Sequence, residues 1–273
     1  MATELGTAYV QIVPSMQGIS GSLSKALGSE ANSAGDEAGT NFMGSFKAKA
    51  LALVAGLGIG KLLKDSISAS ISEGAALQQS LGGVETLFKS SADTVKNYAN
   101  EAYRTTGLSA NKYMESVTGF SASLLQSLGG DTDKAAEVAN MALVDMSDNA
   151  NKMGSSMESI QFAYQGFAKQ NYTMLDNLKL GYGGTKQEMQ RLLADAEKLT
   201  GVKYDLNNLS DVYSAIHAIQ ENLDITGTTA KEAASTFTGS FESMKAAAQN
   251  VLGKIAIGEN VLPALEALAQ TTS

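Results

Sequence analysis

Apolar and polar residues alternate along most of the chain at the spacing of amphipathic α-helices. After Glu73 the apolar positions recur at intervals of three and four, which places them on one face of each helix. The stripes are Val95, Tyr98, Ala99, Ala102 and Tyr103; Tyr113, Val117, Phe120, Leu124 and Leu128; Ala135, Val138, Ala142 and Met146; Met189, Leu192, Leu193, Ala196 and Leu199; and Leu209, Val212, Tyr213, Ile216, Ile219 and Leu223. The pattern predicts an all-α fold whose helices are joined by glycine-containing turns, and each stripe requires a partner surface.

Start signals support these helices. Asp131 follows two glycines and is a candidate N-cap. Three capping boxes place a hydroxyl three residues before a carboxylate, and they predict helix starts at Ser155, Thr185 and Thr229. A further helical stretch then runs from Thr229 to Ile257 and carries Phe237, Phe241, Met244, Ala248, Val251 and Leu252.

The first 72 residues follow different patterns. Residues 7–13 alternate with a period of two and end at Pro14, which predicts a short extended segment and an N-terminal arm over residues 1–18. Residues 19–72 are rich in Ser, Ala and Gly at first and then become apolar and helical. We expect a helical core over residues 73–257. We interpret residues 258–273 as the start of a C-terminal continuation or tail.

The overall charge disfavours a protein that binds nucleic acid through phosphates. The formal net charge is -8 at pH 7, so the diffuse attraction to a duplex is absent and we expect no specific nucleic-acid binding. The chain has no cysteine, which excludes disulfides and Cys-ligated zinc. The N-terminus has an acidic residue where a secretory signal would be basic, so we predict no signal peptide.

Candidate chemistry is sparse, and we predict no catalytic, cofactor-binding or metal-binding residues. His217 is the single histidine, and we interpret it as a half-buried helical residue without a catalytic partner. The segment Gly181–Lys186 lacks the spacing of a phosphate loop, and we interpret it as a flexible connector. Carboxylates at Asp131, Asp133, Asp145 and Asp148 lack the glycine turn and terminal Glu of a calcium loop, so we interpret them as a solvated acidic face.

Three segments together resemble the tail tape measure proteins of long-tailed phages, or prophages, of Gram-positive hosts. They are TAYVQIVPSMQGISGSL at residues 7–23, the run from MSDNANKMGSS to AEKLTG at residues 146–201, and the run from NLSDVYSAIHAIQ to LGKIA at residues 208–256. The resemblance covers nearly the whole chain. Typical members are far longer than 273 residues and often carry hydrophobic spans or a lytic domain downstream. The resemblance therefore implies the N-terminal or core region of such a protein, a truncated form of one, or a degraded prophage product.

The resemblance implies a structural protein without enzymatic activity or cofactors. A member of this family sets the tail length, templates assembly of the tail tube, and leaves through the tail during DNA ejection. The implied partners are the tail tube protein, tail assembly chaperones, tail tip proteins and further copies of the chain. The implied locations are the host cytoplasm during assembly and the lumen of the tail tube afterwards, with transient contact with the host membrane. In the assembled tail we expect an elongated molecule.

A second hypothesis is a membrane-active helical protein. The longest apolar run, Ala50–Gly60, lies between Lys49 and Lys61 and is about half the ~20 residues that cross a bilayer. The run is also typical of a buried helix segment. Under the membrane hypothesis, the run has latent membrane affinity, and its small residues allow close packing between helices in the bilayer.

Overall fold

The computed structural model describes residues 76–235 and 237–272, which belong to one compact unit, Asp65–Ser273. Every regular element among these residues is helical, so the predicted all-α class is confirmed. The N-terminal arm, the segment 19–72 and the apolar run Ala50–Gly60 lie outside the described residues, and the extended segment at residues 7–13 stays a prediction.

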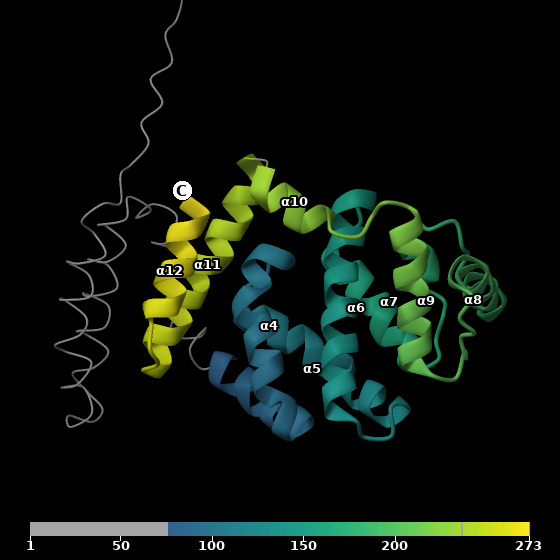
Figure 1. Cartoon of the computed structure of the whole chain (residues 1–273), viewed down its shortest axis with the longest axis horizontal. Helices are drawn as coiled ribbons and strands as arrows, with labels where there is room; N and C mark the ends of the chain where they lie inside the picture. Colours follow the sequence, from purple (N-terminus) through teal and green to yellow (C-terminus); the bar gives the residue numbers. More distant parts are fainter. Residues whose placement is uncertain (1–75, 236, 273) are drawn as a thin grey trace, which may run out of the picture. The chain divides into compact units, whose positions relative to one another are not determined.

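The described unit begins with a helical stretch over residues 76–88 and continues through nine α-helices and two 3-10 turns (Figure 1). Their bounds are η1 Lys89–Ser91, α4 Ala92–Thr105, α5 Ala110–Ser127, α6 Thr132–Met153, α7 Met157–Phe167, η2 Leu175–Leu178, α8 Lys186–Thr200, α9 Leu209–Asn222, α10 Thr228–Ser235, α11 Phe237–Ile257 and α12 Leu262–Thr272. α6 contacts α4, α5, α7, α9 and α10, and is therefore the central helix of the unit.

The predicted apolar stripes form the core. The partner surface that each stripe requires lies within the same chain: α8 packs on α9, and α9 packs on α5 and α6. Stripe residues are buried with few exceptions. Leu199 and Leu223, the last members of their stripes, are 49% and 45% exposed because each lies where its helix ends.

The helix starts agree with the sequence at two positions and differ at two. Asp131 and Thr185 each accept a hydrogen bond from a backbone N–H three residues on, as an N-cap does. The cap of α7 is Ser156 rather than Ser155, because the Ser155 hydroxyl instead donates to the backbone carbonyl of Asn177. Thr229 lies inside α10, which begins at Thr228.

Five aromatic rings form a continuous path through the middle of the core. Phe120 meets Tyr213 edge-on at 5.6 Å between centroids, Tyr213 meets Tyr164 at 5.0 Å, and the path continues through Phe167 to Tyr172. Edge and offset contacts of this kind add stabilisation beyond the buried area. The Tyr213 hydroxyl donates to the backbone carbonyl of Tyr164, which ties α9 to α7.

Residues 258–272 form a turn at Gly258 followed by α12, which packs along α11 (Figure 1). Ala264 and Leu268 of α12 are buried. The Tyr103 hydroxyl of α4 donates to Gln270 Oε1 at 3.4 Å, so α12 also contacts the body of the unit.

The connector Gly181–Lys186 is held by specific contacts rather than being free. Arg191 of α8 donates to the Gly181 carbonyl at 2.7 Å, and its guanidinium lies 4.3 Å from the centre of the Tyr182 ring. Gly184 approaches the backbone of Thr173 so closely that a Cβ at this position would overlap the Thr173 carbonyl.

Gly184→Ala should therefore destabilise the fold by about 1–3 kcal/mol, because the added methyl must displace backbone. Urea unfolding followed by circular dichroism measures the difference. The matched control is Gly82→Ala, at an exposed helical position with open space, where alanine should raise stability by up to ~1 kcal/mol. Equal stability of the Gly184→Ala variant and the wild type would show that the close approach is wrong.

Candidate functional site

A buried carboxylate and the single histidine meet between α6 and α9. Nδ1 of His217 lies 2.8 Å and 3.0 Å from the two carboxylate oxygens of Asp145. The Asp145 side chain is 1% exposed and that of His217 is 31% exposed. The ring is thus fixed by an interior carboxylate on one side and reaches solvent on the other. This arrangement orients an imidazole and favours its charged form.

The environment shifts the pKa of both members upward. Burial raises the pKa of Asp145 to about 6, although the hydrogen bond and charge of His217 oppose this shift. The hydrogen bond to Asp145 raises the pKa of His217 above its ordinary value of 6.5, against the effect of burial. The two groups therefore form an ion pair between about pH 6 and the raised pKa of the histidine.

One turn further along α6, Asp148 is also fully buried. Its carboxylate accepts hydrogen bonds from the backbone N–H of Gly227 at 2.6 Å and of Thr229 at 2.8 Å. Asp148 thus caps α10 from a distant helix. The interpretation of a solvated acidic face holds for Asp131 and Asp133, which are exposed, and is wrong for Asp145 and Asp148. These two carboxylates have partners on α9 and α10 that sequence alone does not reveal.

Further polar side chains of α6, α7 and α9 are buried in this part of the unit. Gln220 Nε2 lies 3.4 Å from the Tyr164 hydroxyl, and Asn149 Nδ2 donates to the Leu178 carbonyl at 3.0 Å. Burial raises the pKa of Tyr164 well above its ordinary range, and the Asp145 charge adds to this shift. The side-chain oxygens of Asn149 and Gln220 are buried without a hydrogen-bond partner in the structure. Not all buried polar groups here are therefore satisfied by hydrogen bonds within the chain.

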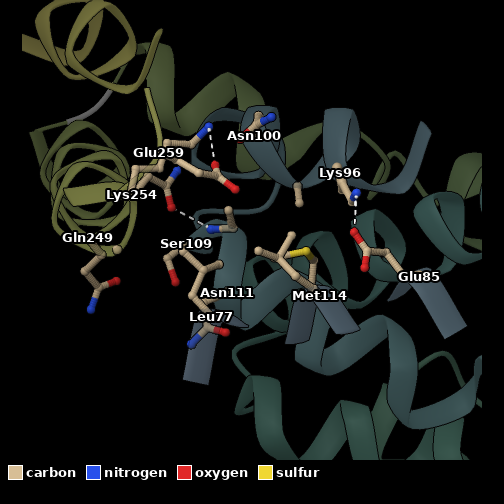
Figure 2. A pocket seen from close by; sticks show the side chains of 15 residues that line it. Leu77, Glu85, Lys96, Asn100, Ser109, Asn111, Met114, Gln249, Lys254 and Glu259 are labelled. Carbon is tan, nitrogen blue, oxygen red and sulfur yellow. Dashed lines mark hydrogen bonds and ion pairs between the residues drawn. The ribbon is translucent and has the colours of Figure 1, made fainter. Parts of the chain in front are cut away.

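A small cavity lies on the other side of the unit, where the 76–88 helix, α4, α5 and α11 meet (Figure 2). Its volume is about 140 Å³, and Leu77 and Met114 supply much of its apolar lining. Ion pairs join Lys96 to Glu85 at 2.8 Å and Lys254 to Glu259 at 3.8 Å at its margins. The four charged side chains that line the cavity are thus paired with one another.

Neither location gathers the ligands of a metal site. Within residues 76–235 and 237–272, no three His, Asp or Glu side chains lie close enough together to hold a metal ion. The Gly181–Lys186 connector leads into the N-terminus of α8, where an anion could bind. The side chain of Glu188 accepts a hydrogen bond from the Gly183 N–H, so a carboxylate already occupies that position.

Sequence reasoning missed the Asp145–His217 pair because the residues are 72 positions apart. One signal was present. Asp145 and Asn149 continue the stripe of Val138 and Ala142 at intervals of three and four, so helical geometry already turned these polar side chains toward the core.

Comparisons with models of known protein families, with curated proteins and with solved structures found no match to this chain.

The single histidine makes the pair directly measurable by NMR. We expect the ring to titrate above pH 6.5 in the wild type and at a lower pH in Asp145→Asn, because the variant removes the partner charge. Glu221→Gln, which removes a weaker and more distant charge, should lower this pKa by less. Titration at 6.5 or below in the wild type would contradict the pairing.

The pair also predicts how stability changes with pH. A raised histidine pKa means that the folded state holds the proton more tightly, so this contribution is complete below pH 6.5 and is lost as pH rises through the raised pKa. Asp145 acts in the same direction between pH 3.8 and about 6. Urea unfolding should therefore show stability falling from pH 6.5 to 8.5, and His217→Gln should flatten this fall. An equal slope in both proteins would rule the histidine out as its source.

Proposed function

We propose that this chain is a structural tail tape measure protein, or the N-terminal or core region of one, which sets tail length and templates the tail tube. The sequence resemblance along residues 7–23, 146–201 and 208–256 carries the proposal. The all-helical fold of the described unit is compatible with it, since a ruler of this family is helical. In this role the buried polar pairs position helices and do not perform chemistry.

The described unit limits how its helices contribute to length. A helix adds about 1.5 Å per residue only along its own axis, and here the helices fold back on one another. We therefore propose that this unit is a folded module of the ruler and that length is set by residues outside it. The apolar stripes are internal, so tube and chaperone proteins would bind its polar surface or other parts of the chain.

The experiment changes chain length without altering the described unit. Deleting residues 19–44, which are 26 in number, should shorten tails by about 39 Å if that segment is helical in the tail, and duplicating it should lengthen them equally. Tail lengths are measured by electron microscopy in the phage or prophage that carries the gene.

A matched control replaces residues 19–44 by a scrambled sequence of the same length and composition, which should leave the tail length unchanged. Deletion and duplication variants that both assemble tails of wild-type length would contradict the proposal.

The apolar run Ala50–Gly60 favours a second candidate, a membrane-active protein. Among the residues that the structure describes, no helix is both long enough and apolar enough to cross a bilayer. If the run acts on membranes, the full chain should release dye from liposomes, and Leu53→Asp should abolish the release. The control Leu223→Asp, at an exposed position in the described unit, should keep it. No release by the unmodified chain would remove this candidate.

A further inference from the structure

We infer that α10, α11 and α12, described over residues 228–235 and 237–272, form a module that opens from the rest of the described unit as one body. We call this module the C-terminal latch. It is hinged at residues 224–227, and polar contacts at three places hold it closed: Asp148 with the start of α10, Asn250 with Ala110, and Gln270 with Tyr103. The inference does not depend on the proposed function.

The first observation is where the continuous core ends. Among the described residues, the connected cluster of buried apolar side chains runs from Leu77 to Ile225. The apolar side chains buried in the latch lie outside this cluster: Ala246, Ala247, Ala248, Val251, Leu252, Ala264 and Leu268. Within the latch, α11 packs mainly on α10 and α12. The latch meets the body through Ile257, which packs against the main cluster, and through contacts of α10 and α11 with α4.

The second observation is the capping contact at the hinge. Asp148 of α6 receives the N–H groups of Gly227 and Thr229, so the start of α10 depends on a side chain of the body. The Thr229 hydroxyl is buried without a hydrogen-bond partner in the structure, which adds a small cost to the closed position. Opening would return these groups to water.

The third observation is the contact between α11 and α5. Asn250 Oδ1 accepts the backbone N–H of Ala110 at 2.6 Å, so a latch side chain satisfies the first turn of a body helix. The cavity of about 140 Å³ lies directly beside this contact, so part of the surface under α11 is not filled by side chains (Figure 2). At this place the latch is held by a short hydrogen bond beside imperfect packing.

The fourth observation is the conformation of the hinge. Asp224 and Gly227 have φ of 55° and 82°, while Ile225 between them is buried at the edge of the core. Left-handed backbone at a non-glycine residue is mildly strained, and a few torsions here can redirect α10. The hinge is short, and it lies where the core ends.

Native-state hydrogen exchange of the full chain, read by mass spectrometry, tests the inference. In wild type, amides of α10, α11 and α12 should exchange at least about tenfold faster than the slowest amides of α6 and α9. As sub-denaturing urea is increased, the opening free energies of all latch amides should converge on one line against urea concentration. A common line identifies one cooperative opening. Exchange of α11 as slow as that of α6 would overturn the inference. Opening free energies that follow different urea dependences in α10, α11 and α12 would overturn it as well.

Two variants remove two of the three polar contacts, those of Asp148 and Asn250. Asp148→Ala and Asn250→Ala should each speed exchange in the latch by roughly tenfold and leave α8 and α9 nearly unchanged. Asp145→Asn is the matched control, since it alters an equally buried residue of α6 that contacts α9 instead of α10, and it should spare the latch. If Asp148→Ala sped exchange in α8 and α9 as much as in the latch, the contact would stabilise the whole unit rather than the latch alone, and the inference would fail. The wild-type measurement decides the question even if a variant does not fold.

Discussion

Two carboxylates lie in the interior near the C-terminal end of α6, and each must find donors there because removing an unpaired charge from water costs several kcal/mol. Asp145 is hydrogen-bonded to the imidazole of His217, and Asp148 accepts hydrogen bonds from two backbone N–H groups at the start of α10. These requirements position α9 and α10 relative to α6. Apolar packing alone is less specific about register, and the hydrogen bonds of these two carboxylates favour one arrangement.

The same requirement gives the two carboxylates different roles in the unit. Asp145 faces the main core, where its partner belongs to a helix that is packed on several sides. Asp148 faces the start of a helix whose own apolar residues are separate from that core. One helix therefore carries two similar side chains, of which one reinforces the centre and the other joins a peripheral element. The difference comes from what lies opposite each residue rather than from the residues themselves.

Helical periodicity was sufficient to predict the fold class and most of the core, because burial of a stripe such as Val212, Tyr213 and Ile216 depends on local spacing. Caps were predictable where the donor is three residues away, as at Thr185, and failed where a side chain such as Ser155 found a more distant acceptor. The candidate site was not predicted. Its contacts join residues 72 to 81 positions apart, and the spacing of one helix does not specify which other helix will face it.

The aromatic path through Phe120, Tyr213, Tyr164, Phe167 and Tyr172 has an optical consequence. The chain has no tryptophan and nine tyrosines, so its near-ultraviolet absorption arises mainly from tyrosine. Three of these tyrosines lie in the path, where close neighbouring rings hold them in fixed and asymmetric surroundings. The contacts along this path therefore contribute to the chirality of the near-ultraviolet spectrum. Loss of that signal with retention of helix would separate the unpacking of this core from the melting of its helices.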